Sequence, residues 1–122
     1  QGLYDITHKV VECVQGSGVN EGLVTLFVRH TSASLLIQEN ADPSVQRDLE
    51  NWLNRLVPEE DPIFTHTLEG PDDMPSHIKC ALTATQLSIP FRNNKLMLGT
   101  WQGIYLWEHR RQAGHREVIV HL

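Results

Sequence analysis

The sequence predicts one α+β domain that combines three helices with several short strands. Its 122 residues fit a single domain over residues 1–122 and leave little room for a second. Three segments carry apolar residues at helical spacing, whereas the others alternate apolar and polar residues or form short apolar runs. Because hairpin-length turns join most of these strands, an α+β sheet fold is favoured over a doubly wound one.

The first part of the domain is expected to form a helix followed by two strands. Asp5 can cap a helix over residues 6–14, and the segment Gly16-Ser17-Gly18 ends it because glycine adopts the left-handed conformation at little cost. Alternating apolar and polar residues then predict a strand over residues 23–30. A second apolar run predicts another strand over residues 33–37.

The second helix has the clearest start in the chain. Asp42 can cap it, Pro43 suits its first position, and Pro58 ends it. The face expected to be buried, with the tryptophan in the core, consists of Val45, Leu49, Trp52, Leu53 and Leu56.

The rest of the chain is expected to contain one helix and four strands. The third helix begins at Asp72 or Asp73, one of which can cap it, and runs to Leu82. The strands are expected over residues 87–90, 96–98, 104–108 and 117–121.

Composition excludes several classes of protein. Ten Lys and Arg against fifteen Asp and Glu give a net charge of −5, which argues against a general binder of nucleic acid or anionic membranes. Cys13 and Cys80 form no CxxC motif, so a four-thiolate zinc site is excluded, and Cys80 is expected to be a buried thiol within a helix. No membrane span and no signal-peptide pattern is visible, so we expect a cytoplasmic protein without nucleic-acid or membrane partners.

Polar residues that suit a ligand site gather in four segments, residues 30–32, 39–42, 66–79 and 99–110. The strongest pattern pairs Asp73 with His77, because an i, i+4 spacing puts both side chains on one helix face. A carboxylate bound to one imidazole nitrogen directs the other nitrogen toward a metal ion or a proton. We therefore expect His77 to meet other imidazoles at a divalent ion, namely His30, His66 and His109.

Simpler explanations compete with this interpretation. Helix capping alone would explain the aspartates that start the helices, and a structural role at a strand end would explain His30. The glycines at 99 and 103 would be explained by a turn alone. No H-E-x-x-H, G-x-S-x-G, Walker or G-x-G-x-x-G motif occurs, so the enzyme classes that they mark are set aside.

Four sequence segments, taken together, are similar to those of a known family: HTSASL at 30–35, ENADP at 39–43, EGPDDMPSHIK at 69–79 and GTWQGIYLWEHR at 99–110. They closely resemble the YjbQ family, and the match covers nearly the whole chain. The resemblance implies a homotrimer whose subunit has mostly antiparallel, β-sandwich-like sheets packed around a buried helix. Family members begin earlier, with an additional strand, so this chain is expected to lack that strand.

The resemblance also implies an activity and a pocket. Some members have a weak thiamine-phosphate synthase activity, a transfer that joins a pyrimidine pyrophosphate to a thiazole phosphate with help from Mg²⁺. Carried onto this chain, the expected catalytic residues are His77, Asp73, His109 and Glu108. The expected substrate-binding residues are Asn40, Lys79, Gln102, Arg110 and Asp72, and the expected metal ligands are His30, His77 and His109.

Two functions follow as hypotheses. One is an enzyme that acts on a small phosphorylated molecule with a divalent ion, either Mg²⁺ on the carboxylates of Glu69, Asp72 and Asp73 or Zn²⁺ on the histidines. The other is a metal- or metabolite-binding homotrimer whose site is not catalytic.

Overall fold

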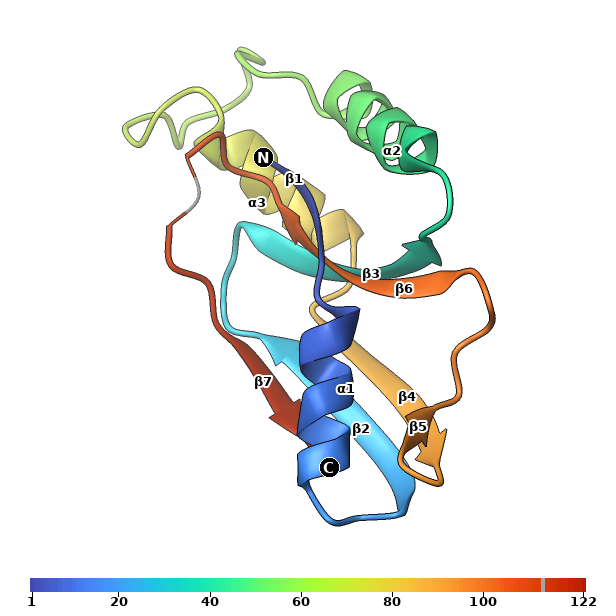
Figure 1. Cartoon of the computed structure of the whole chain (residues 1–122). Helices are drawn as coiled ribbons and strands as arrows, with labels where there is room; N and C mark the ends of the chain where they lie inside the picture. Colours follow the sequence, from blue (N-terminus) through green and yellow to red (C-terminus); the bar gives the residue numbers. More distant parts are fainter. Residues whose placement is uncertain (113) are drawn as a thin grey trace.

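We describe the protein from a computed structural model of the whole chain, in which residues 1–112 and 114–122 are described (Figure 1). The helices and strands, in chain order, are β1 (Gly2–Asp5), α1 (Thr7–Gly16), β2 (Glu21–Val28), β3 (Ala33–Glu39), α2 (Pro43–Leu56), α3 (Asp73–Leu82), β4 (Gln86–Arg92), β5 (Lys95–Leu96), β6 (Gln102–Glu108) and β7 (Val118–His121). No helix among the described residues is both long and apolar enough to cross a membrane.

The strands form two antiparallel sheets. In the three-stranded sheet, β6 lies between β1 and β3, and in the four-stranded sheet the order is β5-β4-β2-β7. Residues of β3 pair with β6 from Ala33 opposite Glu108 to Glu39 opposite Gln102. This register puts the beginning of β3 and the end of β6 side by side at one end of the sheet, near the site residues described below.

Two apolar clusters give the domain its layers. The larger one lies between the two sheets and α1, and its buried members are Val10, Val14, Val24, Leu26, Val28, Ala33, Leu35, Ile89, Phe91 and Ile104. The smaller one packs α2 and α3 on the opposite face of the three-stranded sheet around Leu53, Val57 and Trp107. The strands supply both clusters because successive side chains of a strand point to opposite faces, as Leu35 and Leu36 do.

The α+β class and the three helices predicted from the sequence are confirmed. The six predicted strands are present with shifted ends, and the structure adds β1, which the sequence did not predict. Its four residues are too few to show a period, and they form a strand only because β6 offers them a partner edge. The Asp5 carboxylate accepts a hydrogen bond from the Thr7 backbone N–H, so it serves the start of α1 from one position earlier than the helix's own N-cap, Ile6.

The prediction for the buried face of α2 needs a correction. Asp42 does cap this helix, since its carboxylate accepts the Ser44 N–H at 2.9 Å. Trp52 and Leu56, however, are 54% and 53% exposed, whereas Leu53 is 4% exposed. The helix packs on the sheet through Leu49 and Leu53, and a residue one position away points about 100° aside.

Candidate functional site

The candidate site is built on the first turns of α3 and on the loop before it. Asp72 occupies the N-cap position and Asp73 is the first helical residue. The i, i+4 spacing predicted to bring Asp73 beside His77 does so, and the loop residue His66 approaches the same carboxylate. His66 was one of the imidazoles expected near His77, and its contact with Asp73 depends on how the loop folds over the helix.

Asp73 is the centre of the cluster. Its side chain is 2% exposed, and its Oδ2 lies 2.7 Å from His66 Nε2 and 3.0 Å from His77 Nε2. Its other oxygen, Oδ1, accepts a hydrogen bond of 2.6 Å from Arg110 Nη1. One ligand atom from each of Asp73, His66 and His77 lies within 4.8 Å of the others, which suits a shared metal ion.

The protonation of His77 is constrained by the backbone. His77 Nδ1 lies 2.8 Å from the carbonyl oxygen of Thr31, which can only accept a hydrogen bond, so Nδ1 carries a proton. In a neutral ring Nε2 then presents a lone pair, and it faces the Asp73 carboxylate oxygen. Two acceptors at 3.0 Å repel each other unless a positive species joins them, either a proton on Nε2 or a metal ion.

Arg110 holds the two aspartates in place. Its Nε donates to Asp72 Oδ2 at 3.1 Å, and its Nη2 donates to the carbonyl oxygen of Glu69 at 2.9 Å. Gly70 lies against this contact with a φ of +105°, and a Cβ there would stand 3.3 Å from Asp72 Oδ1. The clamp therefore uses all of the Asp72 side chain and one oxygen of Asp73, and it leaves the other oxygen to the histidines.

A cavity of about 620 Å³ lies beside the histidines, and its lining consists of His30, Thr31, His66, Met74, His77, Cys80, Ala81 and Thr85. His30 Nε2 accepts the backbone N–H of Glu117 at 2.8 Å, so a neutral His30 ring carries its proton on Nδ1. In this arrangement neither nitrogen of His30 has a lone pair free for a metal ion. His30 is suited to donating a hydrogen bond to a ligand instead.

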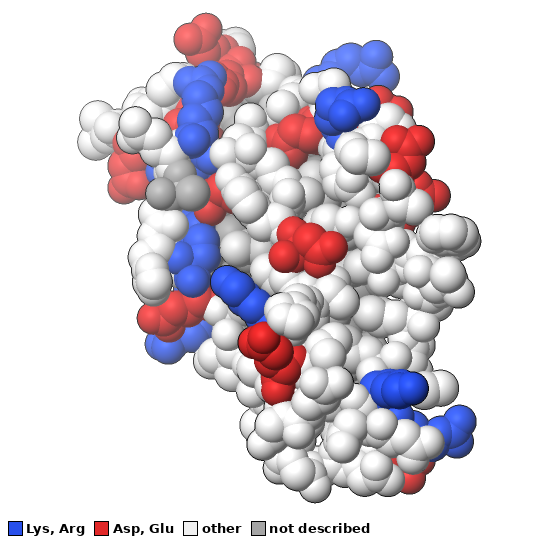
Figure 2. Space-filling view, viewed as in Figure 1, with Lys and Arg blue, Asp and Glu red and all other residues white. Residues whose placement is uncertain are grey.

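The charges around the cavity favour a neutral His30 and ionised aspartates. Burial and the Arg116 charge lower the pKa of His30. Burial raises the pKa of Asp73, but the His66 hydrogen bond and the charges of His77 and Arg110 outweigh it, so its pKa is lowered. On the face shown in Figure 2, basic side chains are interspersed with acidic ones rather than gathered into a basic stripe.

Glu108 and His109, both expected to be catalytic, lie in a buried network next to the cluster. Glu108 is 1% exposed and binds the Arg116 guanidinium through both oxygens, at 2.5 and 2.6 Å. His109 is also 1% exposed; its Nε2 lies 2.9 Å from Ser34 Oγ, and its Nδ1 has no partner among the described residues. Burial, with a smaller contribution from the Lys79 charge, lowers the pKa of His109 to about 4.

The expected metal set of His30, His77 and His109 is therefore not the set that the structure brings together. His77 meets His66 and Asp73, while His109 faces the core and His30 is engaged with the backbone. The sequence pointed to four imidazoles, and only the path of the loop before α3 selects His66 among them.

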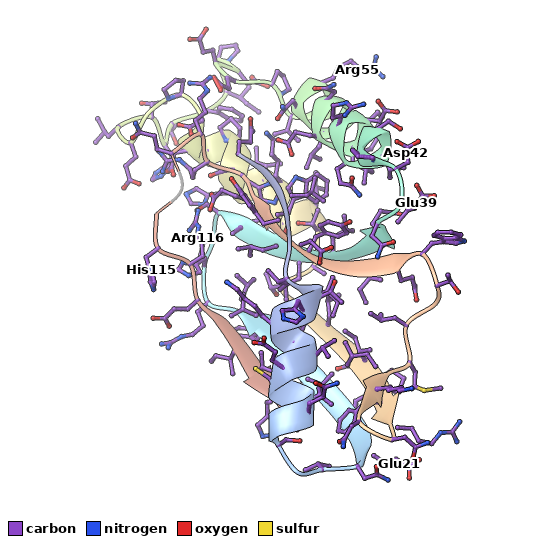
Figure 3. All side chains as sticks on the ribbon, viewed as in Figure 1. Glu21, Glu39, Asp42, Arg55, His115 and Arg116 are labelled. Carbon is purple, nitrogen blue, oxygen red and sulfur yellow. The ribbon has the colours of Figure 1, made fainter. Side chains whose placement is uncertain are left out.

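Two more expected site residues, Asn40 and Gln102, lie at the opposite end of the three-stranded sheet. Asn40 follows β3 and Gln102 begins β6, six residues along the strand from Glu108, or about 20 Å at 3.3 Å per residue. Gln102 Oε1 accepts the backbone N–H of Gly99, so it serves the turn around residues 99–102. Figure 3 shows the separation: Glu39 and Asp42 lie at the connection from β3 to α2, and Arg116 lies across the molecule.

Lys79, the last expected substrate-binding residue, lines a different cavity. It is 4% exposed and donates to Asn54 Oδ1 at 2.5 Å. Burial lowers the pKa of Lys79, while the Glu50 and Asp72 charges oppose that shift. The sequence also gave no signal for Arg116, because nothing in its spacing from Glu108 indicates an ion pair.

The fold and the cluster define a small α+β protein with a carboxylate held between two histidines at the mouth of a cavity. This chain belongs to the UPF0047 family, since the family model described as UPF0047 protein YjbQ-like matches residues 1–122. It is 55% identical to a UPF0047 protein of Synechocystis over 122 residues, covering 100% of this chain and 83% of that protein. It is 47% identical to the UPF0047 protein YjbQ of Escherichia coli over 123 residues, covering 100% of this chain and 88% of that one.

Solved structures agree with this assignment. A conserved hypothetical protein of Thermus thermophilus superposes with a TM-score of 0.88 at 40% identity, covering 99% of this chain and 90% of that one. An uncharacterised YjbQ/UPF0047 protein of Clostridium acetobutylicum gives a TM-score of 0.86 at 38% identity, covering 98% and 88%. The family is thus established by sequence and by fold.

Proposed function

We propose that the protein is a metal-dependent enzyme that acts on a small phosphorylated molecule, with a divalent ion held by His66, Asp73 and His77. The observation that carries the proposal is the hydrogen bond from His77 Nδ1 to the Thr31 carbonyl, which leaves the Nε2 lone pair facing a buried carboxylate. Backbone carbonyls fix metal-binding histidines in this way in many proteins.

The donor set favours a transition metal such as Zn²⁺ over Mg²⁺. Two imidazoles and one carboxylate suit Zn²⁺ and similar ions, whereas Mg²⁺ prefers oxygen ligands. The carboxylate group expected for Mg²⁺ is not free, because Arg110 occupies Asp72 and Glu69 contributes only its backbone oxygen to the same arginine. A divalent ion at this place would supply Lewis-acid stabilisation of phosphate oxygens.

The chain's own groups suit the rest of such a ligand. His30 can donate its Nδ1–H to an oxygen of the substrate, because its other nitrogen is held by the Glu117 backbone. Met74, Cys80 and Ala81 supply an apolar wall against which a flat ring can pack. A phosphorylated heterocycle fits both features, which agrees with thiamine-phosphate synthesis as a secondary activity, the reaction implied by the family resemblance.

We also propose that the protein assembles as a homotrimer whose contacts border this cavity. On the outer face of the four-stranded sheet, Leu23, Phe27 and Ile119 are 52%, 44% and 45% exposed, and Phe27 pairs with Ile119 across the strands. Exposed apolar side chains on one sheet face are typical of an interface. Thr85, which lines the cavity, directly precedes the strand whose first residue pairs with Phe27, so a neighbouring copy on this face would add to the cavity wall.

Metal binding is tested by calorimetric titration of the metal-free protein with Zn²⁺, Mn²⁺ and Mg²⁺. Zn²⁺ is expected to bind most tightly, and His77→Gln should weaken it by at least about tenfold. His8→Gln is the matched control, because His8 is an exposed histidine that pairs with Glu12 on α1. Equal Zn²⁺ affinity in the wild type and His77→Gln would refute the site.

Catalysis is tested separately with the metal-loaded protein. Formation of thiamine phosphate and release of pyrophosphate are measured from the two phosphorylated precursors, and release of inorganic phosphate from a set of phosphate esters. Activity should depend on the added metal and fall at least tenfold in His77→Gln, which corresponds to about 1.4 kcal/mol of transition-state stabilisation. Tight metal binding without any of these reactions would leave a binding protein and refute the enzymatic part. Light scattering that gives a monomer mass would refute the trimer.

A further inference from the structure

Lys79 lies on the face of α3 that points away from the histidine cluster. It comes two residues after His77, which puts its side chain about 200° around the helix. The two residues therefore do not serve one ligand, although they share a helix. Lys79 needs a separate account.

The Lys79 ammonium is buried without a counter-ion. Its side chain is 4% exposed, and the Asn54 amide oxygen, at 2.5 Å, is its hydrogen-bond acceptor. That oxygen is shared, because Gln1 Nε2 also donates to it at 3.1 Å. Within the described part of the chain, no carboxylate forms an ion pair with Lys79 at 4 Å or less. An ammonium group can donate three hydrogen bonds, so two remain for another acceptor.

The acidic groups nearby are already bound to other partners. Asp72 accepts from the side chain of Arg110 and from the backbone N–H of Arg111. Glu59 pairs with the Arg111 guanidinium, and Glu50 accepts the indole N–H of Trp107 at 2.6 Å. Burying a charge without a compensating partner costs free energy, so a ligand that accepts hydrogen bonds from the Lys79 ammonium would stabilise the folded protein.

A cavity of about 300 Å³ beside Lys79 has room for such a ligand. Its lining consists of Gln1, Asn54, Val57, Glu59, Asp72, Pro75, Lys79 and Arg111. It contains two cations, Lys79 and Arg111, and two acids that are both neutralised by arginines. Arg111 pairs with Glu59, whereas no carboxylate among the described residues forms an ion pair with Lys79. A volume near 300 Å³ is at the lower end for ligand sites, which limits the ligand to a small molecule.

We propose that this cavity is a second ligand site that binds a small oxyanion, a carboxylate or a phosphate group, through Lys79. The oxyanion accepts hydrogen bonds from the ammonium group and replaces its missing counter-ion. The site is independent of the proposed metal centre, since its lining includes none of His66, Asp73 and His77.

The test uses the full chain with inorganic phosphate and, in a separate arm, acetate as probes, with chloride at matched ionic strength as the reference. Binding is followed by amide NMR titration of the wild type, by calorimetry and by thermal unfolding. The variants are Lys79→Met, which keeps the apolar stem, and Lys9→Met, which removes an exposed lysine of α1 as a matched control. His77→Gln is included because it disables the proposed metal centre alone.

We expect saturable NMR shifts that centre on Asn54, Val57 and Lys79. The probe that binds more tightly identifies the ligand group as a phosphate or a carboxylate. Lys79→Met should weaken that binding at least tenfold, while Lys9→Met and His77→Gln should keep it. Without the anion, Lys79→Met should be at least as stable as the wild type, because an unpaired buried charge has been removed. Shifts that stay linear with concentration or centre elsewhere, or undiminished binding by Lys79→Met, would overturn the proposal. If Lys79→Met does not fold, the location and saturation of the wild-type shifts decide the question.

Discussion

The replacement Glu108→Gln tests whether this residue stabilises the fold through its buried ion pair with Arg116. Glu108 is 1% exposed and accepts three hydrogen bonds, two from Arg116 and one of 3.0 Å from the Arg110 backbone N–H. Glutamine keeps the volume but removes the charge, and it turns one acceptor into a donor that faces the guanidinium. Arg116, whose side chain is 13% exposed, keeps its hydrogen bond to Ser32 Oγ but is then left as a nearly buried cation that has lost its carboxylate partner.

Removal of one partner from a buried ion pair costs about 3–5 kcal/mol. For a domain of this size the midpoint of thermal unfolding should fall by roughly 10–20 °C. The free energy of unfolding is measured by urea denaturation at neutral pH for the wild type, for Glu108→Gln and for a control variant, Glu117→Gln. Glu117→Gln is the matched control, because Glu117 pairs with Arg29 on the surface, where both side chains are more than half exposed, and its loss should change stability by less than about 1 kcal/mol.

The pH dependence gives a second readout of the same pair. Burial raises the pKa of Glu108, but the hydrogen bonds and charge of Arg116 outweigh it, so the pKa in the folded protein is lowered. The stabilisation is therefore complete above the pKa of the unfolded chain and is lost as the pH falls toward the lower folded value. A Glu108→Gln protein that remained as stable as the wild type, with the same acid sensitivity, would refute this reasoning.

Three further outcomes are expected from measurements of unfolding. Trp107→Ala should cost about 3–5 kcal/mol and Trp52→Ala less than about 1 kcal/mol, because the first side chain is 4% exposed and the second 54%. Gly70→Ala should destabilise by about 1–2 kcal/mol owing to its φ of +105° and to the nearby carboxylate, whereas Gly16→Ala, with open space around it, should not. Stability should rise by up to about 3 kcal/mol between pH 4 and 6.5, since the pKa of His109 is lowered to about 4 and the unfolded chain binds the proton more readily. His109→Gln should flatten that part of the profile, and an unchanged profile would contradict a neutral, buried His109.

Local chemistry made much of the fold predictable. The Asp42-Pro43 start of α2 and the alternation in β2 act through neighbouring residues, so they can be recognised without knowledge of the rest of the chain. The Gly16-Ser17-Gly18 stop of α1 is also local, although Gly16 stays helical and Gly18, with a φ of +74°, is the glycine that takes the left-handed conformation. The same holds for Asp73 and His77, because a helix brings residues four apart together wherever it lies. The resemblance to the YjbQ family, based on the sequence alone, identified the family correctly.

Contacts between distant parts of the chain decided the rest. β1 is a strand because β6 pairs with it, and Trp52 is exposed because α2 turns a neighbouring stripe toward the sheet. His66 rather than His109 joins His77, since the loop before α3 carries one ring to Asp73 while β6 ends with the other ring in the core.

The sequence by itself thus determined the class of fold, the family and the residue types of a polar site. Only the tertiary structure divided those residues among a histidine–carboxylate cluster, a buried Glu108–Arg116 network, a separate Lys79 cavity and a turn around Gln102. The physical reason is the sequence separation over which each kind of interaction acts. Helix spacing and capping depend on residues a few positions apart, whereas the direction of a side chain toward a particular partner depends on how sheets and helices pack, and a sequence pattern does not record that packing.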